Sequence, residues 1–335
     1  MYRHLLPVAV LLLLIPLNIF YGSLSLPPSE IWGALLQDDS ASDVVRFVVY
    51  ELRIPSLITA LLSGCALSVS GLAMQTLFAN PLADPSILGV NAGASLGSAL
   101  AMLLLGGSLT TAVFTLSGFL LTVTAAFCGA MCIIALLLLC SLRLQGNLLL
   151  LITGVMISFA VGSLISLLSF YSTEQGVHSF VIWGMGDFSG VTGERLTFFA
   201  AIILPSLLAV LLLSKPLNAM LLGLDYATSL GFRVTRIRTW LLLLIGLLTA
   251  TVTALCGPIS FIGLAVPHIA RMALHTSNHR ILLPHTLLWG GNIALLCHFI
   301  TRLPADGTTL PLGAITPLLG APVVLYILFR RREQL

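Results

Sequence analysis

Two histidines are the first candidates for chemistry in this sequence, because they share the spacing of a metal-binding pair. His275 and His279 form an HxxxH pattern, and His268 and His285 lie nearby. A catalytic zinc site takes three protein ligands and a structural site takes four. Two histidines four residues apart supply at most two ligands, and no acidic residue lies between them. We interpret the segment as a basic loop and predict no metal site.

Groups that act on nucleotides or exchange thiols are also missing from the sequence. There is no G-x-x-x-x-G-K-[ST] pattern, and the single lysine, Lys215, does not lie in a glycine-rich loop. The six cysteines contain no CxxC pair and fall in or beside apolar runs, as small buried residues do. We predict no catalytic residue and no cofactor, so the energy for any transport must come from outside this chain.

Composition defines the environment in which the chain folds. Of its 335 residues, 58% are hydrophobic and only 8% are charged, and the formal net charge is +3. Soluble domains carry about 25% charged residues, so this chain lacks the charge to cover a surface exposed to water. The composition excludes a soluble enzyme, a disordered chain and a nucleic-acid partner, and it predicts an all-α polytopic membrane protein.

Ten apolar runs approach the length of about 20 residues that a helix needs to cross a bilayer. The first run lacks an A-x-A-like cleavage site, so we expect it to be retained. The eighth run is short and contains Pro267, His268 and Arg271. The expected spans are residues 5–22, 54–77, 87–105, 112–140, 148–170, 196–213, 239–256, 262–275, 282–300 and 313–329.

Charges are distributed unequally between the two sides that ten spans define. If the N-terminus is inside, eleven of the 15 basic residues and only three of the 12 acidic residues fall inside. This satisfies the positive-inside rule and places both termini in the cytoplasm. The inside basic residues are Arg3, Arg143, Lys215, Arg233, Arg236, Arg238, Arg271, Arg280, Arg330, Arg331 and Arg332.

Small residues recur four apart in two of the expected spans. One stripe contains Gly89, Gly93 and Gly97, and another contains Gly154, Ser158 and Gly162. Such stripes let helix backbones approach closely in lipid. Two interpretations stay open for the second stripe, which are tight packing within one chain and the lining of a translocation pathway.

The inside segment of residues 215–238 is too polar to span the membrane, yet it contains clear helix signals. Residues 218–222 can form one helical turn that Gly223 closes, and Asp225 is a candidate N-cap for a second short helix that Gly231 ends. Exposed apolar residues on such helices favour a site for a cytoplasmic partner, and the alternative is a helix resting on lipid headgroups. The apolar residues are Leu217, Met220, Leu221, Leu224 and Leu230.

A second inside feature is a turn in the segment FANPLADPSILGVN, residues 78–91. Pro81 and Pro85 each disfavour helix at the preceding residue, which is Asn80 or Asp84. Asp84 is expected either to cap the next helix or to meet a basic partner surface. The spans otherwise hold almost no ionisable group at mid-membrane depth, and His298 is the one deep candidate. This argues against an ion-coupled secondary carrier, which stays the more distant alternative.

Several stretches in consistent order over residues 45–330 resemble the FecCD-type permease family, the membrane subunits of ABC importers for iron chelates, haem and cobalamin. They are ELRIPSLITALLSGCALSVSGLAMQTLFANPLADPSILGVNAGASLGSAL (51–100), WGMGDFSG (183–190), LGLDYATSLGFRV (222–234), CGPISFIGLAVPHIAR (256–271) and LPLGAITPLLGAPVVLYILF (310–329).

This resemblance implies a type II ABC importer permease fold with ten transmembrane helices, in which residues 1–335 form a single transmembrane permease domain. It implies that the short helices at about 216–232 are coupling helices that insert into an ATPase subunit. The implied partners are a second permease copy or paralogue, two ATP-binding subunits, and a periplasmic or lipid-anchored substrate-binding protein. The coupling positions are Asn218, Met220, Leu221, Gly223, Asp225, Leu230 and Gly231.

The resemblance also implies a docking site for the binding protein at the outer mouth, where family members place arginines that meet glutamates. Arg53 matches one position and Arg302 matches another less tightly, whereas Ser56 stands where many members have a further arginine. The implied function is ATP-driven import of an iron chelate across the bacterial inner membrane, with haem or cobalamin as the alternative cargo. The sequence does not choose among these cargoes, nor between a homodimer and a heterodimer.

Overall fold

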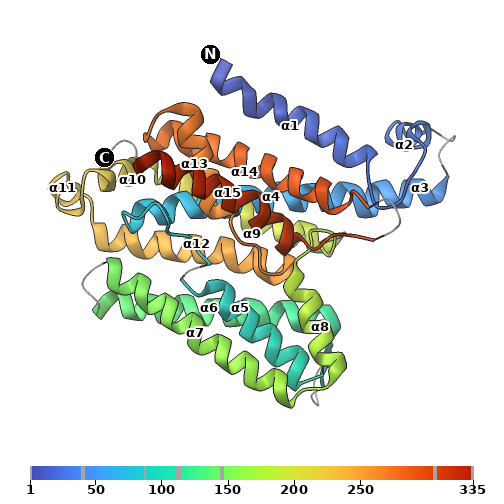
Figure 1. Cartoon of the computed structure of the whole chain (residues 1–335), viewed down its shortest axis with the longest axis horizontal. Coiled ribbons are helices and arrows are strands. Elements are labelled where there is room, and N and C mark those ends of the chain that lie inside the picture. The colour runs from blue at the N-terminus through green and yellow to red at the C-terminus, as the bar shows by residue number, and fades with distance from the viewer. Residues whose placement is uncertain are drawn as a thin grey trace.

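The computed structural model describes residues 2–38, 42–86, 88–106, 108–110, 115–143, 147–304 and 308–332. Figure 1 shows helices that lie side by side along the long axis of the molecule. They are α1 (Tyr2–Phe20), α2 (Pro28–Leu35), α3 (Asp43–Phe47), α4 (Ile54–Leu77), α5 (Val90–Ala99), α6 (Gly118–Arg143), α7 (Asn147–Tyr171), α8 (Glu174–Met185), α9 (Glu194–Leu212), α10 (Ser214–Leu221), α11 (Leu224–Ser229), α12 (Val234–Cys256), α13 (Ile262–Leu274), α14 (His279–Thr301) and α15 (Leu312–Arg332).

Two π-helical segments and one small hairpin complete the described structure. The π-helical segments are η1 (Val48–Arg53), which leads into α4, and η2 (Leu100–Leu104), which extends α5. The strands β1 (Ser108–Thr110) and β2 (Thr115–Ser117) pair antiparallel before α6. The expected span 112–140 therefore begins later than predicted, at Gly118.

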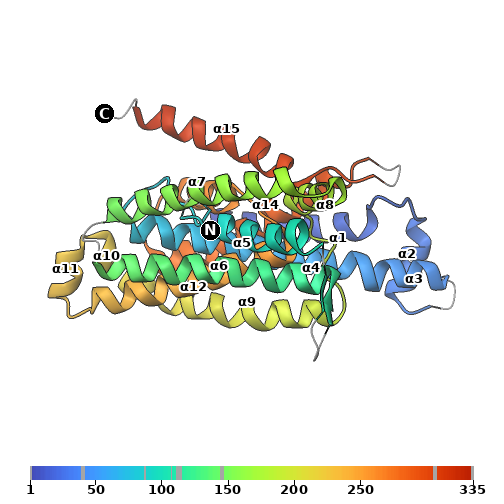
Figure 2. The same cartoon turned by 90° about the horizontal axis from the view of Figure 1, so that it is seen from below.

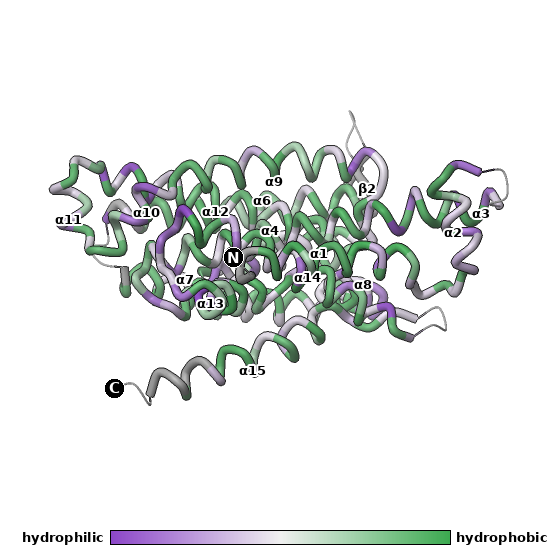
Figure 3. The backbone as a smooth tube through the Cα atoms, turned by 90° about the horizontal axis from the view of Figure 1, so that it is seen from above, coloured by the Kyte–Doolittle hydropathy of each residue, from purple (hydrophilic) through white to green (hydrophobic). Residues whose placement is uncertain are grey.

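The expected pattern of spans is confirmed. Within the described residues, six helices are long and apolar enough to cross a membrane, and four further apolar helices are shorter. Each corresponds to one expected run, and the short eighth run forms α13. Figure 3 shows hydrophobic residues along the middle of the bundle and hydrophilic residues concentrated toward its two ends. This distribution follows from the bilayer, which requires each spanning segment to satisfy its own backbone hydrogen bonds.

Helix α4 forms the centre of the bundle, and most of its residues are buried. It packs against α14, α13, α12 and α9. The close approach depends on glycine, because a methyl group on Gly64 would overlap the carbonyl of Gly290, and one on Gly71 would overlap that of Gly263. In lipid, van der Waals packing rather than the hydrophobic effect holds such helices together.

The first stripe of small residues packs within the chain, at the contact between α5 and α6. A methyl group on Gly93 would lie 2.6 Å from the carbonyl oxygen of Gly129, and one on Gly97 would overlap that of Ala125. Tight packing accounts for this stripe.

Charge separates the two ends of the bundle. Helices α2, α3 and α8 lie at one end, and α10, α11 and the C-terminal end of α15 lie at the other (Figures 1 and 2). We call the first the acidic end, because Glu30, Asp43, Glu174 and Glu194 lie in the first turns of helices that begin there. We call the second the basic end, because it carries Arg143, Lys215, Arg233, Arg271 and Arg280. Asp39, Asp306 and Glu333 lie outside the described residues.

Candidate functional site

The most distinct feature of the basic end is the pair of short helices α10 and α11. Leu213 ends α9 and precedes α10, so α10 follows α9 almost directly. Gly223 has a φ of +111° between α10 and α11, and Gly231 has a φ of +83° after α11. These are conformations that glycine adopts without strain. Two short helices were expected here, but Asp225 lies in the first turn of α11 and is not its N-cap, a position that Gly223 occupies.

An exposed apolar surface covers the outer side of these two helices. We call it the apolar knob and define it as Leu221, Leu222, Leu224, Tyr226 and Leu230, which are 40–66% exposed. The expected exposure of Leu217 and Met220 is wrong, because both side chains are buried against the bundle. Apolar residues at this density, flanked by charges, are typical of a surface that a partner covers.

Asn218 faces inward from α10 toward the start of α14. Its Oδ1 accepts a hydrogen bond from the main-chain N–H of His279 at 2.7 Å, and its Nδ2 donates to Oδ1 of Asn278 at 2.8 Å. His279 is 1% exposed, and its Nε2 lies 2.8 Å from Oγ1 of Thr76 at the end of α4. Asn218 therefore belongs to an internal network, whereas the exposed residues of α10 and α11 are free to meet a partner.

The predicted turn after α4 is present, but its second half folds back into the bundle. Oδ1 of Asn80 accepts a hydrogen bond from the N–H of Leu82 at 2.9 Å, and the carbonyl of Pro81 lies 2.9 Å from Nε2 of His268. The turn then carries Asp84 inward, so that a methyl group on Gly263 would lie 2.6 Å from the Asp84 carboxylate and 3.0 Å from the carbonyl of Leu67. Leu67 is about 15 Å from the basic end of α4 at 1.5 Å per residue.

This return path places a carboxyl group within the bundle, where the sequence predicted almost none. Asp84 is 6% exposed, and its Oδ1 accepts hydrogen bonds from the N–H and the hydroxyl of Ser86. Pro85 is also buried. Asp84 therefore fixes the return path through Ser86 and the start of α13, and it is not exposed for a basic partner surface.

At the acidic end, Arg53 is an internal residue. It is 3% exposed, and its guanidinium donates hydrogen bonds to the carbonyls of Ile19, Phe20 and Leu24 at 2.7–3.1 Å. These bonds tie the end of α1 and the segment after it to the start of α4.

Arg302 is also internal, and it contacts the serine at position 56. It is 8% exposed, and its Nη2 donates to Oγ of Ser56 at 2.7 Å. Burial lowers the pKa of Arg302 to about 10, Asp187 opposes that shift, and Arg53 adds to it. An arginine at position 56 would place a second guanidinium next to that of Arg302. Nη1 of Arg302 has no partner among the described residues.

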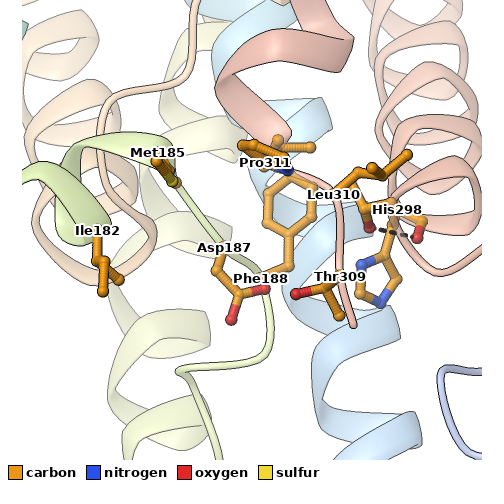
Figure 4. Close-up of a pocket in the computed structure, with 11 residues that line it drawn as sticks. Ile182, Met185, Asp187, Phe188, His298, Thr309, Leu310 and Pro311 are labelled. Atoms are coloured by element: carbon orange, nitrogen blue, oxygen red, sulfur yellow. Dashed lines mark hydrogen bonds between the residues drawn. The ribbon is translucent and has the colours of Figure 1, made fainter. Parts of the chain in front are cut away.

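A pocket of about 170 Å³ opens at the acidic end, close to Arg302. Figure 4 shows Asp187, Phe188 and Thr309 around it, with His298 on the α14 side. The His298 ring packs edge-on against Phe188 with ring centroids 5.7 Å apart. His298, the one deep histidine identified from the sequence, therefore lies near the acidic end and contacts an aromatic ring.

The second stripe of small residues is divided between two environments. Gly154 and Ser158 face the turn before α5, because a methyl group on Gly154 would lie 2.8 Å from Cα of Leu88, and one on Gly89 would lie 3.1 Å from Oγ of Ser158. Gly162 is exposed, and a methyl group there would meet nothing within 4 Å. The geometry favours tight packing for Gly154 and Ser158, and it leaves Gly162 on an open face of α7.

Three residues of these sites were not identified from the sequence. Thr76, Asn278 and Gln75 contact partners that lie 60 to 203 positions away in the chain; Oε1 of Gln75, for example, accepts a hydrogen bond from Arg271 at 2.7 Å. Only Asn278 carried a local signal, since an asparagine before an apolar run is a typical N-cap, and its side chain does cap α14. No local pattern marks Thr76 or Gln75.

Comparison with known proteins agrees with this architecture over nearly the whole chain. The model of the FecCD transport family matches residues 10–330. The haemin transport system permease of Yersinia pestis is 34% identical over 314 residues, which cover 93% of this chain and 91% of that protein. The vitamin B12 import system permease of Escherichia coli is 36% identical over 328 residues, covering 98% and 95%.

A solved structure extends the likeness to three dimensions. An inward-facing transporter described as a metal-chelate type ABC transporter matches with a TM-score of 0.82 at 30% identity, covering 97% of this chain and 99% of that one. Its extent rules out a likeness confined to one motif or one helix pair. The chain therefore belongs to the FecCD transport family and is a permease subunit of an ABC importer.

Proposed function

We propose that this permease forms half of a transmembrane pathway that imports an iron chelate, driven by separate ATPase subunits that bind the apolar knob. The exposure of five large apolar side chains on α10 and α11 carries this proposal. Nothing else in the described chain covers them, and burying them would stabilise a docked partner. The remaining parts are a second permease copy or paralogue, a second ATPase subunit and a binding protein, with residues 1–335 acting as one permease domain.

We propose that the basic end faces the cytoplasm of a bacterial cell and the acidic end faces the periplasm. The excess of arginine at the basic end supports this orientation through the positive-inside rule. It places both termini and the apolar knob in the cytoplasm. A single cysteine in place of Asp225, in a variant without the six native cysteines, tests the orientation. It should react with a membrane-impermeant maleimide in inside-out vesicles and stay unlabelled in intact spheroplasts.

The proposed mechanism needs no covalent chemistry in this chain. Closure of the two ATPases on ATP would draw the coupling helices together, and the paired permeases would then change the side to which their pathway opens. Gly162 supports a place for the open face of α7 along that pathway, because a methyl group there would meet no described residue within 4 Å. Gly154 and Ser158 would act behind this face, by holding α7 against the turn at Leu88.

We also propose that the binding protein docks at the acidic end, where Arg53 and Arg302 are not equally good candidates for the contact. Arg302 is the better candidate, because its Nη1 has no partner in the part of the chain that the structure describes, whereas the Arg53 guanidinium already donates to three carbonyls. A carboxylate that reached Arg302 would form a charge-assisted hydrogen bond and would fix the orientation of the docked protein.

The cargo is proposed as an iron chelate, with haem and cobalamin as the alternatives that the two permease relatives favour. The metal-chelate description of the structural neighbour supports the first choice. The test is to purify the cognate binding protein, identify the ligand that it retains, and measure ATP-dependent uptake of that ligand by the reconstituted complex. Retention of haem or cobalamin, with uptake of that compound alone, would replace the iron chelate as cargo.

A further inference from the structure

We infer that Asn218 is a positioning residue that fastens the first coupling helix to the core of the permease, so that α10 moves together with α14 and the basic end of α4. This inference rests on the proposed function, since it says how motion at the ATPase contact would reach the transmembrane helices. The evidence is a chain of hydrogen bonds that runs from α10 through the start of α14 to α4.

The orientation of the Asn218 amide follows from its partners. Oδ1 of Asn278 caps α14 by accepting from the N–H of Arg280 at 3.0 Å, so the group that Asn218 presents to it at 2.8 Å must be the donating Nδ2. Oδ1 of Asn218 then faces His279, where it accepts from the main-chain N–H at 2.7 Å and lies 3.0 Å from Nδ1. One side chain of α10 thus bonds to two successive residues at the start of α14.

The imidazole of His279 extends this connection to a third helix. An acceptor at 3.0 Å from Nδ1 requires that nitrogen to carry the proton in a neutral ring, which leaves Nε2 as an acceptor. The single proton of the Thr76 hydroxyl is shared between Nε2 at 2.8 Å and the carbonyl of Leu72 at 3.0 Å, and the contact with His279 is the shorter one. His279 and Thr76 are 1% and 5% exposed, so water does not compete for the contact between their side chains. The path Asn218–His279–Thr76 therefore joins α10, α14 and α4 in the interior.

Beyond these bonds, α4 and α14 pack closely against each other. Gly64 and Gly290 bring the two backbones together, and Oγ of Ser68 on α4 donates to the carbonyl of Thr286 on α14 at 3.0 Å. A displacement of α10 must therefore carry both helices with it or break the network.

Helix α11 differs from α10 in this respect. Its Thr228 and Ser229 hydroxyls bond only to carbonyls of α11 itself, and a glycine with positive φ lies at each end of it. The two coupling helices therefore have different roles. Helix α11 supplies much of the apolar contact with the ATPase and can tilt, whereas α10 is the stiff element that transmits the motion.

The test measures cargo transported per ATP hydrolysed in the complete reconstituted complex. Thr76→Val keeps the shape of the side chain but removes the bond to His279, and Asn218→Ala removes the bonds to α14. We expect both complexes to assemble and to hydrolyse ATP at near the unmodified rate. Transport per ATP should fall by about two- to tenfold, the effect of losing one hydrogen bond on an equilibrium. The matched controls are Thr76→Ser, which keeps the hydroxyl, and Thr59→Val, which removes a buried hydroxyl bond to a carbonyl of α4 far from the coupling helices; both should keep the original ratio.

Unchanged transport per ATP in both Thr76→Val and Asn218→Ala would overturn the inference while leaving the proposed function intact. If Asn218→Ala fails to assemble, Thr76→Val decides, because Thr76 is buried away from the ATPase contact. A second readout needs no cargo. In the purified chain, Asn218→Ala should speed amide hydrogen exchange at the start of α14, and equal exchange in variant and original chain would refute the network. Absence of ATP-driven uptake by the unmodified complex would instead refute the proposed function.

Discussion

Truncation of Leu222 tests the apolar knob as an ATPase contact, and its effect can be worked out from the structure. The side chain is 66% exposed and lies between α10 and α11. Complete burial of a leucine side chain contributes about 1.5–3 kcal/mol, so covering the exposed two-thirds would contribute about 1–2 kcal/mol. Leu222→Ala should therefore weaken binding of the cognate ATPase subunit by about 5- to 30-fold, at about 1.4 kcal/mol per factor of ten.

The assay is equilibrium binding of the purified ATPase subunit to the permease in nanodiscs. Leu318→Ala is the matched control, because Leu318 is 71% exposed on α15 but lies in an apolar span away from the knob. It should leave the affinity unchanged, and neither substitution should alter thermal stability by much, since both side chains are largely free of internal contacts. Equal affinities for Leu222→Ala and the unmodified chain would refute the assignment of the knob.

Three further changes test the packing, the acidic end and the buried carboxyl. Gly71→Val should prevent folding, measured as loss of monodisperse protein on size exclusion, because the new side chain would overlap the backbone of Gly263; Gly162→Ala should fold normally. Ser56→Ala should lower stability by about 1.5–3 kcal/mol in thermal unfolding, because the buried Arg302 guanidinium loses an acceptor; no shift in the midpoint would contradict the contact. Asp84→Leu should lower stability, because the N–H and the hydroxyl of Ser86 lose their acceptor inside the bundle. The thermal midpoint should fall relative to the unmodified chain, and equal midpoints for the two proteins would argue against a structural role for the buried carboxyl.

The spans were predictable because lipid imposes a strong constraint on sequence. Every backbone group at membrane depth needs an internal partner, so apolar runs of sufficient length must form helices. The short helices α10 and α11 were also predictable, because Gly223 and Gly231 mark their ends locally. The prediction that Asp225 is an N-cap was wrong, because Gly223 takes the N-cap position of α11 and the helix begins without a side-chain cap.

The depth of a residue within the bundle and the partners of its side chain were not predictable, because both depend on residues far away in the chain. The prolines around Asp84 specify a turn, yet the same turn fits the membrane surface or the interior equally well. Only the contact with Gly263, 179 positions later, places the carboxyl within the bundle. Arg53 and Arg302 show the same limit. The family resemblance implied that both are docking groups at the outer mouth, whereas the carbonyls near Ile19 and the hydroxyl of Ser56 hold them inside.

The most direct test of the central claim is uptake of the identified cargo by proteoliposomes that hold this chain with and without its ATPase subunits. We expect uptake only when the ATPase subunits, the binding protein and ATP are all present, and a complex with substitutions in the apolar knob should lose it. Rapid uptake by the permease alone, driven by an ion gradient and indifferent to ATP, would contradict the account.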